Sequence, residues 1–448
     1  MIERFLFKKL ELWVVLLLIK IIFLTSLLFG SLLLVHSNDP KRFPVLGNLS
    51  TEIANFPISV YKALFVGGSN PAGLVSTELR FDAKDGEFFN ENYDADQIVV
   101  IPHVCPDQQG WCVSLFDLMT HDKFTITDIN QIIRSLTNEL KPEASNNTIG
   151  ASNVLFAPRF DELGNLYLLT NSGLFVKLGS DMQVKWAKSN LRYHHTFNFT
   201  NDRSSIWAIG YGQENCKTYP EFEYDTLLND CLVQIDSNSG NVISIHSMTN
   251  AMIDANLHNH LFIGRLDRSV ADPLHINDVQ PVNLESSHFS KGDVFVSLGH
   301  ANMVLLYNTI SREIKWNMTD GLFHQHDVDI LDGSTIAIFN NNRVITDEDK
   351  VFKHNEILKY DFNDGKKTNL FQDIMKNYDV RTVNQGLFEI IGESFFVEDN
   401  NYGRVLLFNK EAPIFEYYSK NKEGFSQVLG WSYVETNPEI LKELRKYF

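Results

Sequence analysis

The sequence predicts an all-β protein, a six-bladed β-propeller that follows an N-terminal transmembrane helix. Three observations lead to this prediction: a four-stranded unit recurs at intervals of about 40 to 80 residues, a long apolar run precedes it, and histidines recur at matching places in the repeat. Such a repeat is typical of a propeller or an extended β array. Closing the array into a ring removes its exposed sheet edges, so we predict the propeller.

Five units of the repeat follow residue 140. Their second strands are β-branched and aromatic runs such as residues 293–297 and 334–339, and polar, glycine-containing turns such as residues 236–240 separate third from fourth strands. Strands before residue 140, joined by C-terminal residues near 428–434, are expected to supply the sixth blade. Residues 128–140 have helical periodicity and are expected to lie in a connection.

The apolar run spans residues 12–35 and carries one charge, Lys20. As a helix it would rise about 36 Å, more than the roughly 30 Å of a bilayer core. Basic residues precede it, so the positive-inside rule keeps residues 1–11 cytoplasmic and exports the remainder to the periplasmic or extracytoplasmic side. A cleaved signal peptide is the alternative. The run is too long for one and no small-residue cleavage site follows it, so we predict an uncleaved anchor.

The rest of the chain divides by composition. Residues 36–96 mix proline, asparagine and serine with short apolar runs, and we expect a linker with irregular packing segments there. Residues 97–448 are assigned to the propeller. The formal charge of −17 argues against a nucleic-acid partner, because phosphate binding needs a basic surface.

Four cysteines form two local pairs, Cys105 with Cys112 and Cys216 with Cys231. In an exported chain such pairs indicate two disulfides, each closing a short loop. Zinc binding is the alternative, but neither pair has the Cys-x-x-Cys spacing of a zinc site.

Histidines occupy three successive first strands of the repeat: His194 and His195, then His275, then His326. First strands line the channel of a propeller, so these side chains are expected to converge at one mouth. The alternative is that they are hydrogen-bonded structural residues.

The other histidines have no such placement. His103, His288, His300 and His354 are therefore assigned to the surface or to packing. A metal on His324 and His326 is a further alternative, which would need a third ligand.

At these residues the sequence resembles the bacterial arylsulfate sulfotransferase family, which is independent of 3'-phosphoadenosine 5'-phosphosulfate and is built on a six-bladed propeller. The resemblance rests on DPLHINDV at residues 272–279, VSLGHANMV at 296–304, IKW at 314–316, QHD at 325–327 and IFNN at 338–341. It extends from about residue 151 to residue 433.

The resemblance implies ping-pong transfer of a sulfuryl group from an aryl sulfate to a phenol. His326 matches the family's nucleophile, which carries the group as a sulfohistidine, and Asp327 or Asp329 could fix its tautomer. His275 and one of His194 and His195 match histidines that contact the sulfate, and Asn277 is a further donor. No cofactor and no metal are implied.

One position departs from the family pattern. Family members usually carry an arginine that contacts sulfate where this chain has Gly299. A charge-assisted bond of that kind contributes about 1.5 to 3 kcal/mol. Arg265, Arg268, Arg343 and Arg381 are the cations that could compensate, and Gly299 is expected to leave space for a larger ligand.

Two classes of function remain. The first is an exported, membrane-anchored enzyme that transfers a sulfuryl group between small aromatic molecules, or carries out a related hydrolysis or lyase reaction in the same channel. The second is a non-catalytic propeller that binds a ligand or a protein partner, which the loss of the arginine at Gly299 would favour.

Overall fold

The computed structural model describes residues 12–38, 45, 85–91, 93, 95–105, 110–140, 154–212, 229–263, 272–344, 350–351, 354–410, 412–421, 424 and 426–448. The chain divides into two units, Met1–Asn70 and Pro71–Phe448. The first holds α2 (Leu12–Asn38), in which Trp13–Val35 has a mean hydropathy of 2.4 and is long and apolar enough to cross a membrane. None of that segment is buried, so it is a candidate membrane span.

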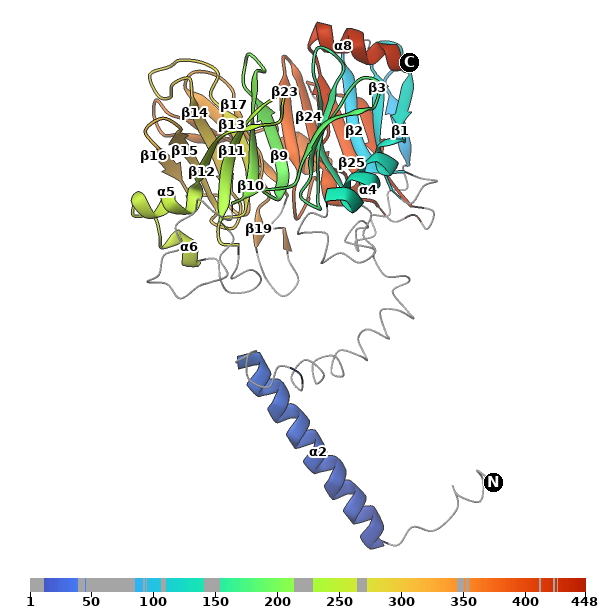
Figure 1. The fold of residues 1–448 in the computed structure, drawn as a ribbon, viewed down its shortest axis with the longest axis vertical. Helices are drawn as coiled ribbons and strands as arrows, with labels where there is room; N and C mark the ends of the chain where they lie inside the picture. The colour runs from blue at the N-terminus through green and yellow to red at the C-terminus, as the bar shows by residue number, and fades with distance from the viewer. Residues whose placement is uncertain are drawn as a thin grey trace, which may run out of the picture. The chain divides into compact units, whose positions relative to one another are not determined.

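The second unit is a six-bladed β-propeller, as the repeat predicts (Figure 1). Each blade is an antiparallel sheet, whose strands are named below from the innermost outward. Blade I holds β27 (Tyr433–Glu435), β2 (Ile98–Val104), β3 (Trp111–Asp117) and β4 (Lys123–Ile126). Blade II holds β5 (Leu155–Phe160), β6 (Leu166–Thr170), β7 (Phe175–Leu178) and β8 (Val184–Lys188). Blade III holds β9 (Tyr193–Phe199), β10 (Ser205–Tyr211), β11 (Asp230–Asp236) and β12 (Val242–Ser247).

Blade IV holds β13 (Ile276–Pro281), β14 (Asp293–Leu298), β15 (Met303–Asn308) and β16 (Glu313–Met318). Blade V holds β17 (Val328–Ile330), β18 (Thr335–Asn340), β21 (Glu356–Asp361) and β22 (Lys367–Leu370). Blade VI holds β23 (Leu387–Ile391), β24 (Ser394–Asp399), β25 (Arg404–Asn409), β26 (Ala412–Tyr418) and a fifth strand, β1 (Gly86–Phe89). A separate ribbon pairs β19 (Arg343–Val344) with β20 (Lys350–Val351).

Short helices occupy the connections. They are α4 (Ile129–Leu140), α5 (Met248–Asp254), α6 (His260–Ile263), α7 (Gln372–Asn377) and α8 (Pro438–Leu444), with 3₁₀ turns η3 (Asn400–Tyr402) and η4 (Arg445–Tyr447). α4 confirms the helix expected at residues 128–140. In Figure 1, α4, α5 and α6 lie at the lower face of the propeller and α8 at the upper face.

The pattern of burial along each strand follows from its place in the blade. The middle strands β14 and β24 are buried at every position, because other blades cover both of their faces. The outer strand β16 alternates between exposed and less exposed residues, as a strand with one solvated face does. The hydrophobic core therefore lies between blades.

Both ends of the described propeller take part in its closure. β27 pairs with β2 and completes blade I, as the sequence analysis expected for residues near 428–434. β1 pairs with β26 at the outer edge of blade VI. The assignment of residues 36–96 to a linker missed β1, because GEFF is too short to carry a period; most of that segment lies outside the described residues.

Buried carboxylates join successive blades. Each accepts a hydrogen bond from a backbone N–H on the innermost strand of the next blade, which satisfies a donor that the fold buries. The pairs are Asp230 with Ile276 N (2.9 Å), Asp278 with Val328 N (3.0 Å), Asp327 with Phe388 N (3.0 Å) and Glu389 with Val434 N (2.9 Å). Burial raises the pKa of each of these four carboxyls, and that of Glu389 to about 7.

A disulfide joins Cys105 to Cys112, which confirms the first predicted pair. Cys216 lies outside the described residues, so the second pair remains a prediction.

Candidate functional site

Each blade has a non-glycine residue with a positive φ within or shortly before its innermost strand, and blade III has a second, Arg192, directly before β9. Apart from Arg192, they are Trp431 (69°), Ala157 (46°), His195 (59°), His275 (50°), His324 (55°) and Gln385 (59°), for blades I to VI in turn. This conformation is unfavourable for residues with a side chain and recurs at functional sites. In blades III, IV and V the residue is a histidine, so the fold places three imidazoles at equivalent positions.

Five imidazoles form a continuous series across these three blades. Ring centroids lie 4.7 Å apart for His195 and His275, 4.2 Å for His275 and His300, 5.7 Å for His300 and His324, and 5.2 Å for His324 and His326. His275 and His300 are stacked, with 15° between their planes. We call these five residues the histidine cluster.

His326 is buried, and its hydrogen bonds determine its tautomer. The amide nitrogen of Asn341 donates to the carbonyls of Thr382 (3.1 Å) and Gln385 (2.7 Å), so the amide oxygen of Asn341 faces His326 Nδ1 at 2.8 Å. That oxygen only accepts, so Nδ1 carries the proton and Nε2 the lone pair. The backbone N–H of Gln385 donates to this lone pair at 2.9 Å. The expectation that Asp327 or Asp329 fixes the tautomer was wrong, because Asn341 and the Gln385 N–H are the partners of the two ring nitrogens, and the carboxylate of Asp327 binds the next blade instead.

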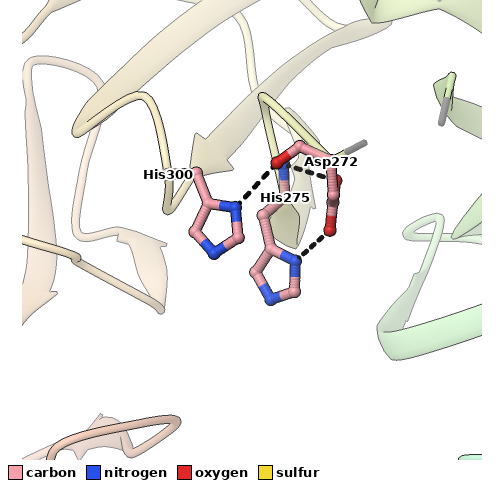
Figure 2. Close-up of side chains that lie close together, drawn as sticks. All are labelled: Asp272, His275 and His300. Carbon is pink, nitrogen blue, oxygen red and sulfur yellow. Dashed lines mark hydrogen bonds and ion pairs between the residues drawn. The ribbon is translucent and has the colours of Figure 1, made fainter. Parts of the chain in front are cut away.

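Asp272 orients two other rings of the cluster (Figure 2). Its carboxylate accepts from His275 Nδ1 at 2.5 Å, and its backbone carbonyl accepts from His300 Nδ1 at 2.8 Å. One ligand atom from each of these three residues lies within 4.8 Å of the others, which is close enough for a metal site. By contrast, His326 uses both ring nitrogens and His324 uses Nε2 in bonds to protein, which argues against the alternative of a metal on that pair.

His195, and not His194, faces the cluster. The register of β9 shifts so that His195 and Thr196 lack opposing residues on β10, and this bulge redirects the His195 ring towards His275. His194 instead binds the carboxylate of Asp230 at 3.0 Å and stacks on Tyr211. The two histidines meet at 2.7 Å between their Nδ1 atoms.

Arg343 is the arginine that reaches the cluster. Its guanidinium is buried and donates to His324 Nε2 at 2.9 Å and to the side-chain oxygen of Asn384 at 2.5 Å. Arg381 is exposed and pairs with Asp379. Arg265 and Arg268 lie outside the described residues.

Gly299 does not leave the space that the sequence suggested. A Cβ on Gly299 would lie 2.5 Å from the amide nitrogen of Asn277, so the Asn277 side chain fills that volume. Asn277 is fully buried and its amide nitrogen donates to the carbonyl of Gln325 at 2.7 Å. Asn277 therefore supports the loop that carries His326 into β17, and its NH₂ group is engaged with that loop.

The cluster combines neutral imidazoles with a positive charge. Burial lowers the pKa of His326 to about 3, and it lowers the pKa of His195, His300 and His324 as well. Burial acts in the same direction on His275, but the hydrogen bond and charge of Asp272 outweigh it and raise the His275 pKa. With Arg343, this arrangement suits an anion.

Sequence reasoning placed His195, His275 and His326 correctly in relation to one another, and it missed several partners. His300 was assigned to surface or packing, yet it stacks on His275. Asp272 and Asn341 received no role in the site, since each reaches it through local turns that no residue spacing shows, and Arg343 was one of four arginines that the sequence could not tell apart. Aligning the beginnings of the six innermost strands with the residues just before them would have found His324.

A family model for arylsulfotransferases (ASST) matches residues 165–420, more than half of the chain. The chain belongs to the arylsulfotransferase family. The matched region begins in blade II, ends after β26 and contains the whole histidine cluster of this arylsulfotransferase-family protein. Its family membership supports an arylsulfotransferase-like function in general.

Several solved structures resemble the chain at low sequence identity. A protein of unknown function from Bacteroides caccae is 8% identical with a TM-score of 0.44, covering 75% of this chain and 99% of its own. Hydrazine synthase from Kuenenia stuttgartiensis is 12% identical with a TM-score of 0.40, covering 72% of this chain and 80% of its own. The nidogen/laminin complex is 6% identical with a TM-score of 0.41, covering 76% of this chain and 98% of its own. No curated protein sequence matches the chain.

Proposed function

We propose that this protein is an exported, membrane-anchored arylsulfotransferase that moves a sulfuryl group from an aryl sulfate to a phenolic acceptor. The observation that carries the proposal is His326: a buried imidazole held as the Nδ1–H tautomer by Asn341, beside Arg343-bound His324, in a chain of the arylsulfotransferase family. A neutral imidazole with a defined lone pair is the form that can attack sulfur.

In the first half-reaction Nε2 of His326 forms a bond to sulfur while the bond between sulfur and the aryl oxygen breaks. The phenolate leaves with the electron pair of that bond. In the second, the oxygen of an acceptor phenol attacks the sulfur, the phenol proton passes to solvent and replaces the one taken up by the released phenolate, the N–S bond breaks, and Nε2 regains its lone pair. Negative charge collects on the sulfuryl and leaving oxygens, where His275 and Arg343 favour it.

The attack requires one hydrogen bond to break first. The N–H of Gln385 occupies the Nε2 lone pair, so the segment 382–386 has to move before His326 can react. The side-chain oxygen of Asn401 holds this segment by accepting from the N–H groups of Val383 and Asn384 at 2.8 Å each. Gln385 itself has φ of 59°, so the closed position carries backbone strain that favours opening.

We place the propeller outside the cytoplasm. α2 would serve as an uncleaved anchor with the N-terminus in the cytoplasm, and the disulfide between Cys105 and Cys112 supports an oxidising compartment. The domain limits that we propose are residues 12–35 for the anchor, 36–96 for the linker, of which β1 (Gly86–Phe89) joins blade VI, and 97–448 for the rest of the propeller.

The test is an assay of the purified full chain with 4-nitrophenyl sulfate, with and without phenol. We expect phenol-dependent release of nitrophenol that disappears in His326→Ala. Release without phenol that still depends on His326 would indicate a hydrolase. Unchanged release by the variant would exclude His326 as the nucleophile.

A non-catalytic propeller is the second candidate. The Gln385 bond to His326 and the glycine at position 299 favour it, because both remove a group that transfer would use. Absence of nitrophenol release by a folded protein that still binds 4-nitrophenyl sulfate would support this candidate over the enzyme.

A further inference from the structure

We propose that a cleft between the outer parts of blades III and IV binds a small zwitterion with a primary ammonium and a carboxylate, as an amino acid or a short peptide has. The cleft has a volume of about 620 Å³, within the range of cavities that hold small molecules. It is lined by β12, by α5 and by Tyr307 and Arg312 of blade IV, and it lies at the end of these blades where Figure 1 shows α5. None of its lining residues belongs to the histidine cluster, so the inference does not depend on sulfuryl transfer.

Two charges of opposite sign line this cleft without pairing. Among the residues that the structure describes, neither the guanidinium of Arg312 nor the carboxylate of Asp254 makes an ion pair or a side-chain hydrogen bond. Both residues are exposed, and both charges reach the hydroxyl of Tyr307. Burial raises the pKa of Tyr307 to about 12, while Arg312 acts to lower it and Asp254 to raise it. A ligand that carries a carboxylate and an ammonium meets both free charges.

Three acceptors in the cleft match the three N–H donors of a primary ammonium group. Asn250 and Asp254 are four residues apart on α5, so they lie on one face of the helix. The side-chain oxygen of Asn250 is buried and has no hydrogen-bond partner among the described residues, as an acceptor that waits for a ligand would. The third acceptor is the hydroxyl oxygen of Tyr307.

A chain of hydrogen bonds orients the Tyr307 hydroxyl. Ser244 donates to the side-chain oxygen of Gln234 at 3.3 Å, so its own oxygen accepts from Nε2–H of His246 at 3.0 Å. His246 Nδ1 then carries the lone pair and accepts from the Tyr307 hydroxyl at 3.2 Å. Burial and the charge of Arg312 lower the pKa of His246 to about 4, so the ring is neutral at pH 7. The Tyr307 proton is therefore committed to His246, and its oxygen is left to accept from a donor in the cleft.

The backbone of Arg312 is fixed by the turn that joins β15 to β16. The side-chain oxygen of Asn308 accepts from the N–H groups of Ile310 at 3.0 Å and Ser311 at 2.7 Å. The backbone carbonyl of Asn308 accepts from Arg312 N–H at 2.9 Å, and Arg312 has a φ of 62°. A guanidinium on a turn held in this way is suited to bind a carboxylate through two parallel hydrogen bonds.

The wall of the cleft favours a ligand with an apolar side chain. Val242 and Ile243 of β12 line it and expose 37% and 55% of their surface. An apolar ligand group removes this surface from water, which stabilises the complex. Leucine and leucyl-leucine combine such groups with both charges, so we choose them as probes.

The experiment is calorimetric titration of the purified full chain with L-leucine and L-leucyl-L-leucine. We expect one site per chain for at least one probe, and the comparison between them distinguishes the amino acid from the peptide. The amide of the bound probe lacks the carboxylate and its N-acetyl derivative lacks the ammonium. Each should bind about 10- to 100-fold more weakly, the loss expected for a charge-assisted hydrogen bond.

Two variants assign the charges. Arg312→Gln should bind the acid and the amide with equal affinity, and Asp254→Asn should bind the free amine and the N-acetyl derivative with equal affinity. The matched control Arg134→Gln changes an exposed arginine of α4 outside the cleft and should bind like the parent chain. Circular dichroism establishes that each variant is folded.

Absence of binding of both probes at millimolar concentration by the folded parent chain would overturn the proposal. So would a folded Arg312→Gln chain that still distinguishes the acid from the amide as the parent does. The nitrophenol assay reports on the histidine cluster alone, so failure of either idea leaves the other to its own measurement.

Discussion

The environment of His326 determines which of its nitrogens can react. The side-chain amide of Asn341 is oriented by two backbone carbonyls, and its oxygen accepts the hydrogen bond from Nδ1–H of His326. An amide oxygen adds no negative charge, so it leaves the His326 pKa low, at about 3, where burial sets it. His275 has the opposite arrangement, with a carboxylate partner that raises its pKa. Two imidazoles in one cluster thus differ in charge because their Nδ1 partners differ.

Asn341→Ala should lower the rate of nitrophenol release by about 10²-fold, since His326 loses the acceptor that selects its tautomer. Asn342→Ala is the matched control: its buried amide belongs to the same run of asparagines but binds Asn340 and His354, not His326. Initial rates with 4-nitrophenyl sulfate measure the effect. Equal losses in the two variants would mean that Asn341 acts only through stability.

Residue types and repeat positions were enough to predict that these histidines come together, but not which residues they bind. His326 and His275 stand at recognisable places in successive blades, and the repeat brings them together. The volume at Gly299 could not be predicted, because it depends on the rotamer of Asn277 across the sheet. The role of His300 depends on the turn at Asp272, which bends the chain so that a carbonyl meets a ring from another strand.

At the scale of elements, the innermost strands carry both the site and the contacts between blades. Positive-φ residues turn side chains into the cluster at the start of these strands, and a few residues later the carboxylates bind the next blade. Strand positions followed from alternation and turn residues, and so the blades were predictable. The positive-φ conformations were not, because histidine and glutamine give no sequence signal for them.

The buried contact between Glu389 and blade I predicts how the stability of the fold depends on pH. The pKa of Glu389 is raised to about 7 from 4.5, mainly by burial, so the folded state binds this proton more tightly than the unfolded chain. Its contribution to stability is therefore present below about pH 4.5 and is lost as pH rises through about 7. Glu389→Gln stays neutral and can still accept from Val434 N–H.

We expect the melting temperature of Glu389→Gln to equal that of the parent chain at low pH and to exceed it increasingly as pH rises through about 7. Thermal unfolding followed by circular dichroism at a series of pH values measures the difference. A constant difference across the series would show that Glu389 does not titrate in this range.

At the scale of the whole molecule, the ring closes through contacts between the two ends of the propeller. Ile98 of β2 pairs with Glu435 of β27, and Arg445 binds Asp117 at 2.7 Å. The sixth blade could be predicted because five complete units leave unpaired strands at both ends. The fifth strand of blade VI could not, since four residues have too little pattern.

A chain that stops at residue 431 loses β27 and α8 and should no longer unfold in one cooperative transition, because blade I then lacks its innermost strand. Arg445→Ala is the control, which breaks the ion pair with Asp117 but keeps β27. Limited proteolysis and calorimetry compare the two. A truncated chain as protease-resistant as the control would mean that three strands suffice for blade I.

The pairing of β2 with β27 also imposes an order in time. Strands more than 300 residues apart in the chain have to meet, so blade I is the last that can be completed as the chain emerges from a ribosome or a membrane translocon. Until residues 433–435 arrive, β2 presents a free edge to any other extended chain. The unfinished ring is therefore the species most exposed to proteases and to aggregation, and its lifetime is set by how fast the last strand is delivered.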